Sequence, residues 1–314
     1  MTDCPICNSK TTVMEELYDD RFGHTGYYTI RQCESCDHCF VEKPMSKDEL
    51  ARLYTSHYQR SHFEVSNFTP VRKMGGFRGW LSGENQAAYC WVPPGVRVLD
   101  VGCGVGETLA YHASRDCQAF GLEVDENIKH IADSLGLNIT IGTLESNPYE
   151  PEFFDYITMD QVIEHLPEPV PTLKEAYRIL KPEGYLILST PNCRGWGRKV
   201  FRRRWINWHT PYHLNLFSKK SIANAVGQAG FEIKDLVSIT ASDWLYYQLV
   251  HSVLYPEYGK PSVYWSKERP WHVWELWTRR GIKILRLLKI THAVTRFFDF
   301  LGIGDGMVII LRKK

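Results

Sequence analysis

The sequence has no long hydrophobic run, no surplus of charge of one sign and no visible secretory leader. No segment reaches the roughly 18 uncharged apolar residues that a membrane-spanning helix requires. Lys and Arg number 37 against 36 Asp and Glu, so no overall basic field indicates a nucleic-acid partner. Asp3 lies near the N-terminus with no apolar stretch beside it, which argues against a signal peptide. We therefore expect a cytoplasmic protein whose nine cysteines are reduced or metal-bound.

Two phosphate-binding signatures are also missing. The chain contains no G-x-x-x-x-G-K-[ST] sequence, which excludes a P-loop. The stretch 96–106 reads V-R-V-L-D-V-G-C-G-V-G, and Glu107 stands where a dinucleotide-binding turn needs its third glycine. The acidic Asp100 and Glu107 are unfavourable neighbours for a pyrophosphate. They favour a cofactor that carries positive charge.

The composition supports a substantial core, with 44% hydrophobic and 13% aromatic residues. From residue 96 onwards, strand-like and helix-like patterns alternate, which is typical of a parallel sheet covered on both faces. We expect an α/β protein with a Rossmann-like, mostly parallel seven-stranded sheet. The predicted strands are 96–101, 119–123, 138–141, 156–159, 185–189, 231–240 and the closing strand 306–312. The predicted helices are 106–114, 125–135, 170–180 and 218–229.

Four cysteines near the N-terminus form two C-x-x-C pairs, Cys4 with Cys7 and Cys33 with Cys36. Two such pairs supply the four thiolates of a closed tetrahedral zinc site. A β-like run at 27–30 lies between them, as expected for a zinc ribbon. Because all four positions are filled by protein, the predicted zinc is structural and stands in for a core that residues 1–42 could not build alone.

The remaining segments divide the chain further. Residues 43–95 are predicted to form a helical connector that lies over the ligand mouth. It would contain a capped helix from Ser46 to beyond Glu49 and a helix-like stretch over 85–91. Residues 96–242 and 305–314 are expected to form the core. Residues 243–304 form an insertion rich in tryptophan and tyrosine.

In a parallel sheet, ligands bind beyond the carboxyl ends of the strands. Asp100 with its glycines, Glu123 and Asp160 with Gln161 end three of the predicted strands. Glu123, at the end of the second strand, is placed where a carboxylate binds both hydroxyls of a ribose. These residues predict a nucleoside-containing cofactor at this edge.

Four motifs occur in order between Val98 and Asn192: V-L-D-V-G-C-G-V-G, G-L-E-V-D, F-D-Y-I-T-M-D-Q-V-I-E-H-L and I-L-K-P-E-G-Y-L-I-L-S-T-P-N. Together they resemble the class I S-adenosylmethionine (SAM)-dependent methyltransferases. The resemblance implies that Glu123 binds the ribose of SAM and that Leu144 borders the adenine. It places Asp160 and Gln161 beside the amino-acid end of the cofactor. It assigns the methionine moiety to Asp100, Gly102, Cys103, Gly104 and Gly106.

Methyl transfer to an oxygen or nitrogen of high pKa needs a base as well as an acceptor held in line. The candidates are Glu164 and His165 after the fourth strand, and His209 and His213 after the fifth. Histidine titrates near neutrality, which suits it to this role. The alternative for His165 is that it hydrogen-bonds locally and only orders its turn.

Two basic segments bear on the partner. Arg194–Arg204 interleaves arginines with aromatic residues and is either a solvated loop or a site for an anionic acceptor or surface. From Arg279, basic residues recur at helical spacing up to Lys289 beside several tryptophans. Such a helix suits peripheral contact with the cytoplasmic membrane face through 265–300. Alternatively, it is a cap packed on the core.

A zinc ribbon before a methyltransferase core resembles bacterial enzymes that modify sugars and glycans. The predicted function is therefore SAM-dependent methylation of an oxygen or nitrogen on a glycan, sugar-nucleotide, lipid-linked or related small-metabolite acceptor. The acceptor is expected to be anionic. An RNA methyltransferase is the first alternative, with nucleic acid the less favoured partner. The second is a non-catalytic zinc-binding interaction module on a degenerate methyltransferase fold.

Overall fold

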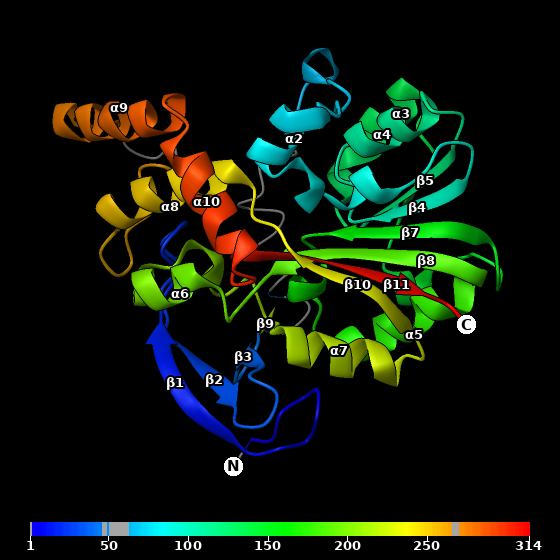
Figure 1. Ribbon diagram of the computed structural model, residues 1–314, viewed down its shortest axis with the longest axis horizontal. Coiled ribbons are helices and arrows are strands. Elements are labelled where there is room, and N and C mark those ends of the chain that lie inside the picture. Colours follow the sequence, from blue (N-terminus) through cyan, green and yellow to red (C-terminus); the bar gives the residue numbers. More distant parts are fainter. Residues whose placement is uncertain (1, 46–48, 50–62, 266–269) are drawn as a thin grey trace.

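The computed structural model describes residues 2–45, 49, 63–265 and 270–314 (Figure 1). A seven-stranded sheet forms its centre, and a four-stranded sheet lies beside it at the N-terminal end of the chain. The capped helix predicted from Ser46 falls outside the described residues. The predicted Rossmann-like architecture with seven strands is confirmed.

The central sheet has the strand order β10-β11-β8-β7-β4-β5-β6. The five strands from β6 to β8 run parallel, whereas β11 lies antiparallel between β10 and β8. After the insertion, the chain returns to the sheet and places β11 between β10 and β8. The strand bounds are β4 Arg97–Val101, β5 Gln118–Glu123, β6 Ile139–Ile141, β7 Phe154–Asp160, β8 Leu180–Pro191, β10 Glu232–Ser238 and β11 Gly306–Arg312.

Helices cover both faces of this sheet (Figure 1). The helices α3 Glu107–Ala113 and α4 Lys129–Leu135 lie on one side, and α5 Pro169–Ile179 and α7 Lys219–Gln228 lie on the other. Apolar side chains of α5 and α7 pack with strand residues in one continuous core. The sequence dictates where α7 begins, because Ser218 caps it and forms a capping box with Ser221.

Two predicted elements differ from the structure. The stretch 85–91 is not one helix but two 3₁₀ turns, η3 Glu84–Gln86 and η4 Ala88–Trp91. Ala87 between them has an extended backbone, which breaks any continuous helix. Strand β8 is also longer than the predicted 185–189 and begins directly after α5. The short helix α2 Gly76–Ser82 completes the connector.

The N-terminal module is joined to the core by its sheet. The strands β1 Thr11–Leu17, β2 Tyr28–Cys33 and β3 Cys39–Val41 are extended by β9 Asn215–Leu216, which lies between β8 and α7 in the chain. The Ser218 hydroxyl, at the start of α7, donates to the carbonyl of Cys36 at 2.7 Å. Asp37, after the second cysteine pair, has the left-handed backbone that ribbons usually assign to glycine (φ 59°). The N-terminal module is thus packed against the core through a shared sheet and does not form an independent domain.

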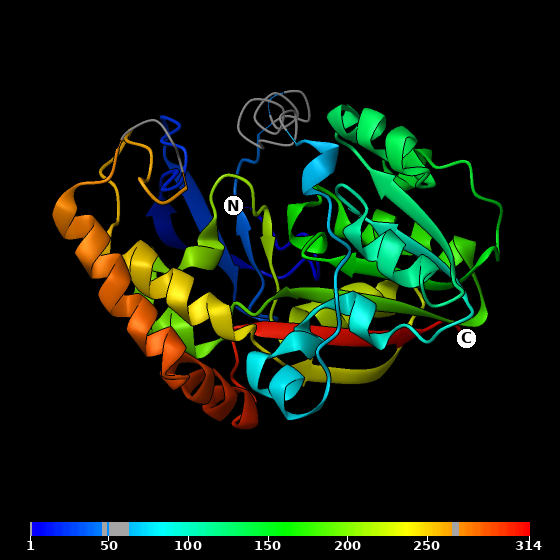
Figure 2. The same ribbon diagram turned by 90° about the horizontal axis from the view of Figure 1, so that it is seen from above.

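The insertion forms three helices, α8 Ser242–Val253, α9 Val273–Leu287 and α10 Ile290–Phe300, which pack on one another. Figure 2 shows α9 and α10 along the outer edge of the molecule, with α8 inside them. Among the described residues, no helix combines the length and the apolar character needed to cross a bilayer. After α10, the Asp305 carboxylate accepts hydrogen bonds from Gly197 N and from Trp205 Nε1 at 3.1 Å, which ties helix α6 Trp196–Phe201 to the start of β11.

Candidate functional site

The glycine-rich turn after β4 lies at the carboxyl edge of the sheet, beside the end of β7. Gly102, Gly104 and Gly106 all have left-handed backbones, with φ of 73°, 57° and 87°. A Cβ built on Gly102 would lie 2.6 Å from Cγ2 of Val162, which follows β7. The turn therefore needs glycine both for its backbone and for its close approach to the neighbouring strand end.

Two carboxylates, those of Asp100 and Glu123, lie beside this turn. Asp100 is buried and accepts hydrogen bonds from the hydroxyls of Thr158, at 2.7 Å, and Thr108. Burial raises the pKa of its carboxyl. The Glu123 carboxylate accepts from Gly104 N and from Val124 N, each at 2.9 Å, and so holds the turn against the end of β5.

The other predicted cofactor residues surround the same turn. Cys103 is buried within it, and a Cβ on Gly121 of β5 would meet its sulfur. Leu144 is buried in the 3₁₀ turn Leu144–Ser146 that follows β6. The predicted set therefore converges on one edge of the sheet, although its residues are spread over some 60 positions from Asp100 to Gln161.

Asp160 and Gln161 end β7 and face outwards from the sheet. Gln161 has a left-handed backbone (φ 54°), and its side-chain amide donates to the Ser189 hydroxyl at 2.8 Å. Burial raises the pKa of Asp160 to about 6, although Ala88 N donates to its Oδ2 at 3.3 Å. A cationic group bound here would offset the cost of the buried charge.

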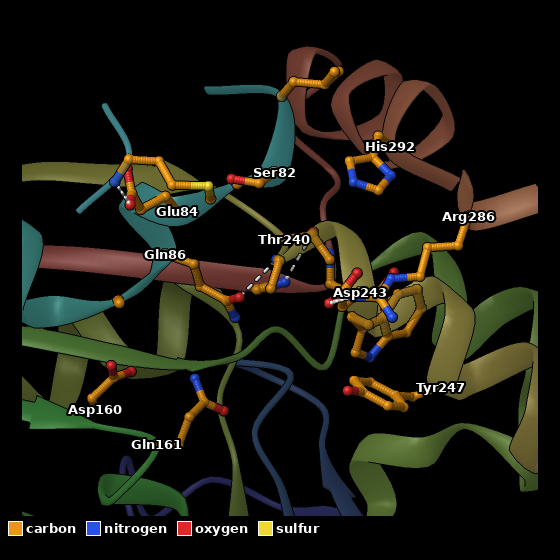
Figure 3. A pocket seen from close by; sticks show the side chains of 18 of the residues that line it. Ser82, Glu84, Gln86, Asp160, Gln161, Thr240, Asp243, Tyr247, Arg286 and His292 are labelled. Atoms are coloured by element: carbon orange, nitrogen blue, oxygen red, sulfur yellow. Dashed lines mark hydrogen bonds and ion pairs between the residues drawn. The ribbon is translucent and has the colours of Figure 1, made fainter. Parts of the chain in front are cut away.

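A cavity of about 970 Å³ opens in front of these two side chains (Figure 3). One wall comes from the sheet edge, with Asp160 and Gln161, and another from the connector, with Glu84 and Gln86. The insertion supplies the remaining wall: Asp243, Trp244, Tyr247, Arg286, Lys289 and His292. Because Gln161 is next to Val162, which touches the glycine turn, the cavity adjoins the predicted cofactor site.

Most of these cavity residues were not predicted as site residues. The connector was expected to lie over the ligand mouth, but Glu84 and Gln86 were not singled out. Asp243 and Arg286 pair at 2.6 Å across 43 positions of the chain. The aromatic content of the insertion and its basic residues at helical spacing pointed to this region, but as a membrane contact or a cap and not as a cavity wall. No local spacing could have identified the pair.

The four candidate bases converge in space. The rings of His165 and His213 have centroids 4.6 Å apart, and those of His209 and His213 are 4.8 Å apart. Glu164 and His165 lie in the 3₁₀ turn Ile163–His165 after β7. We call these four residues the Glu-His cluster.

Burial changes the acid–base character of the Glu-His cluster. It raises the pKa of Glu164 to about 8 and lowers that of His165 to about 4. The pKa values of His209 and His213 also lie well below the usual range, chiefly because burial disfavours the charged imidazole. The imidazoles are therefore neutral but weak bases near pH 7. Their assignment as general bases stays a prediction.

The four cysteines of the N-terminal module, which we call the cysteine cluster, also lie together. The sulfur atoms are 3.7 Å apart for Cys4 and Cys36, 3.5 Å for Cys7 and Cys33, and 3.4 Å for Cys7 and Cys36. A disulfide would need about 2.05 Å. Four thiolates at about 2.3 Å from a tetrahedral ion stand about 3.8 Å apart. The cluster therefore has the donor type and nearly the spacing of a tetrahedral metal site.

The basic segment Arg194–Arg204 packs against the protein. Arg203 pairs with Glu15 of β1 at 3.4 Å, and Arg194 lies 3.8 Å from Asp37. Arg204 donates to the carbonyl of Ser252 at the end of α8. Several of these arginines thus connect the ribbon and the insertion to the core, while the side chains of Arg194 and Arg203 stay about half exposed.

The methyltransferase domain family matches residues 48–236, more than half of the chain. The chain belongs to this family. It is a SAM-dependent methyltransferase of class I, as the sequence motifs implied.

Individual relatives are more distant. This methyltransferase is 26% identical over 189 residues to the ubiquinone biosynthesis O-methyltransferase of Pseudomonas entomophila, a match that covers 56% of this chain and 79% of that one. Among solved structures, the [4+2]-cyclase SpnF is 17% identical with a TM-score of 0.51, and the alignment covers 86% of this chain and 96% of SpnF. A possible histamine N-methyltransferase from Thermotoga maritima is 23% identical with a TM-score of 0.49, covering 85% and 99% of the two chains. The likeness to SpnF shows the fold alone.

The glycine turn provides a direct prediction. Gly102→Ala should weaken SAM binding at least about tenfold, equivalent to about 1.4 kcal/mol, because the added methyl group displaces Val162. Gly136→Ala is the matched control: this glycine also has a left-handed backbone (φ 64°), but a Cβ there meets nothing within 4 Å.

Both substitutions should lower the free energy of unfolding by about 1–2 kcal/mol through backbone strain. Titration calorimetry with SAM and urea unfolding separate the two effects. Equal SAM affinity in the two variants would contradict the placement of the cofactor at this turn.

Proposed function

We propose that this enzyme transfers a methyl group from SAM to an oxygen or nitrogen of an anionic acceptor that is bound in the cavity. The acceptor would be a glycan, a sugar nucleotide, a lipid-linked intermediate or a related small metabolite. The observation that carries the proposal is the position of the cavity. It lies at the end of β7, beside the glycine turn that follows β4, and it is closed by the insertion, so the proposed donor and acceptor sites would meet at Asp160 and Gln161.

The residues of the sheet edge fit the cofactor. In this proposal Glu123 would bind the ribose and Leu144 would border the adenine. The turn from Asp100 to Gly106 lets the methionine portion come close, and Asp160 offers its buried carboxylate to the positive charge. When bound, SAM supplies an electrophilic methyl group on a sulfonium. The protein's part is to hold the acceptor lone pair in line with the methyl carbon, whose bond to sulfur breaks as the new bond forms.

The charge of the cavity wall favours an anion. Three of its four acidic side chains are engaged by the protein: Asp243 pairs with Arg286, Glu84 accepts from the backbone of Gly75 at 2.9 Å, and Asp305 accepts from the backbone of Gly197 at 3.1 Å. The fourth, Asp160, is the one proposed to face the positive charge of the cofactor. In the part of the chain that the structure describes, Arg72 and Arg78 also line the cavity and form no ion pair. Guanidinium groups bind phosphates and carboxylates through paired hydrogen bonds.

Labelled SAM and a panel of sugar nucleotides, lipid-linked saccharides and tRNA test this proposal. We expect methyl transfer to an anionic member of the first two groups. Arg78→Gln should raise the KM for that acceptor at least about tenfold, the loss of one charge-assisted contact, with little change in kcat. Lys129→Gln, which removes an exposed charge on α4, is the control. Transfer to tRNA alone, with a steep dependence on salt, would establish the RNA alternative instead.

The cysteine cluster is proposed to bind structural Zn²⁺. Its four sulfur atoms fit a closed site with no position left for a substrate. Zinc would fix the two cysteine loops on the side of the sheet that β9 extends, and its binding free energy would contribute to folding.

Elemental analysis of the purified enzyme should find one zinc per chain. Cys7→Ser should lose most of this zinc and lower the melting temperature. Cys117→Ser, which alters a buried cysteine outside the cluster, should keep it. A wild-type enzyme that folds without bound metal in the presence of a chelator would contradict the proposal.

Helix α9 supports a further proposal, contact with the surface of an anionic membrane. Among its residues only Glu275 is buried, while Trp274 and Trp277 are 57% and 64% exposed and Leu287 is 67% exposed. The expected packing of an apolar face against the core is thus mostly absent. Among the basic residues, Arg279 lies over the ring of Trp271 and Arg286 over that of Tyr246, both in the insertion. Only part of the basic face is therefore directed away from the protein.

The same helix also lines the cavity through Arg286. Indole rings beside basic side chains are suited to the interface between lipid headgroups and acyl chains. An enzyme bound to the membrane through α9 would receive a lipid-linked acceptor directly from the bilayer. The membrane contact and the lipid-linked acceptor are therefore compatible proposals.

Flotation with vesicles containing anionic phospholipid should recover the wild-type enzyme with the lipid. Trp274→Gln combined with Trp277→Gln should abolish flotation and leave the fold intact, since both side chains are exposed. Val124→Gln, at an equally exposed position after β5, should float like the wild type. A role for the α9 surface would be refuted if none of the three proteins floated with the vesicles, or if all three did.

A further inference from the structure

The Glu-His cluster contacts the cavity lining through the hydrogen bond of His213 to the carbonyl of Asn207, and its hydrogen bonds are arranged in a way that methyl transfer alone does not explain. From these contacts we propose that Glu164, His165 and His213 bind a divalent transition-metal cation. The site is separate from the cysteine cluster and differs from it in donor chemistry, with two imidazole nitrogens and one carboxylate oxygen.

The two imidazoles are held in the orientation of metal ligands. Nδ1–H of His165 donates to the carbonyl of Tyr212 at 2.9 Å, and Nδ1–H of His213 donates to the carbonyl of Asn207 at 2.7 Å. Each bond places the remaining proton on Nδ1, so that Nε2 carries the lone pair. Histidine ligands of metals are typically fixed in this way by a hydrogen bond from the other ring nitrogen.

The carboxylate is held in a matching way. Glu164 is fully buried, and its Oε2 accepts from the Thr190 hydroxyl at 2.9 Å. Its Oε1 has no hydrogen-bond partner among the described residues. A buried carboxylate oxygen without a partner is costly, and a coordinated cation would remove that cost.

The distances permit coordination with small side-chain movements. The ligand atoms of the three residues all lie within 4.8 Å of one another. Ligands about 2.1 Å from a tetrahedral ion stand about 3.4 Å apart. Two imidazoles and a carboxylate suit Zn²⁺, Mn²⁺ or Fe²⁺, and three protein ligands leave at least one position open.

The open position would be near the cavity. Three cavity-lining residues are close to the cluster along the chain or through a hydrogen bond. Gln161 lies three positions before Glu164, and Pro191 follows Thr190, which donates to Glu164. The Asn207 carbonyl accepts a hydrogen bond from His213. A hydroxyl coordinated to a divalent cation loses its proton more easily. This role toward the acceptor rests on the proposed function, whereas the binding of the cation does not.

Titration of the full-length, zinc-loaded enzyme with Mn²⁺ tests the site, with free Mn²⁺ measured by electron paramagnetic resonance. Mn²⁺ prefers oxygen and nitrogen donors, so the cysteine cluster should not compete for it. We expect one Mn²⁺ per chain and a higher melting temperature with Mn²⁺, reversed by a chelator. Glu164→Gln and His213→Gln should each weaken binding at least about tenfold. His112→Gln removes a buried histidine of α3 and should bind as the wild type.

If the cluster variants do not fold, the wild type still decides the matter. Co²⁺ added to the zinc-loaded enzyme should give ligand-field bands without thiolate-to-cobalt charge transfer. The proposal is overturned if Mn²⁺, Co²⁺ and Zn²⁺ all fail to bind beyond the zinc of the cysteine cluster, or if both cluster variants bind as the wild type. Failure of methyl transfer in the acceptor panel would leave these binding measurements unaffected.

Discussion

The close approach of the glycine turn to the end of β7 is the constraint on which the site depends. Strands β4 and β7 are neighbours in the sheet, and their carboxyl ends leave no room for a side chain at Gly102 beside Val162. The turn proposed to face the cofactor is therefore in direct contact with the segment that leads from β7 beside the proposed acceptor cavity. Methyl transfer requires the donor and acceptor atoms to be held close together and in line. The pairing of β4 with β7 would bring the two proposed sites close together, whatever the conformation of the surrounding loops.

The convergence of the proposed cofactor residues at one edge of the sheet could be predicted because its determinants are local. A buried strand that ends in Asp100 and runs into glycines has few structural interpretations, and Glu123 falls at the end of the next strand. The sheet edge then brings such residues together irrespective of the intervening sequence. The closing strand, β11, was likewise predicted from its own apolar run and has the predicted bounds.

The acceptor half depends on contacts between distant segments, which no sequence window contains. Asp243 meets Arg286 only because α8 and α9 pack side by side. The Glu-His cluster shows the intermediate case, since its residues were named from sequence but their mutual contact was not foreseen. Their burial, which makes the imidazoles weak bases, depends on the ribbon and the insertion enclosing them. Neither the residue types nor their spacing could convey that environment.

The segment between β8 and α7 links all of these parts through its backbone. Leu214 N donates to the carbonyl of Glu164 at 2.9 Å, and its own carbonyl accepts from Val41 N of the ribbon at 3.1 Å. Asn207 lines the cavity, and β9 pairs with β3. A change in the ribbon can therefore reach the Glu-His cluster and the cavity wall through two consecutive hydrogen bonds. The small N-terminal module is thus fixed to the segment that carries His213 and Asn207, because its four-stranded sheet includes β9 of that segment.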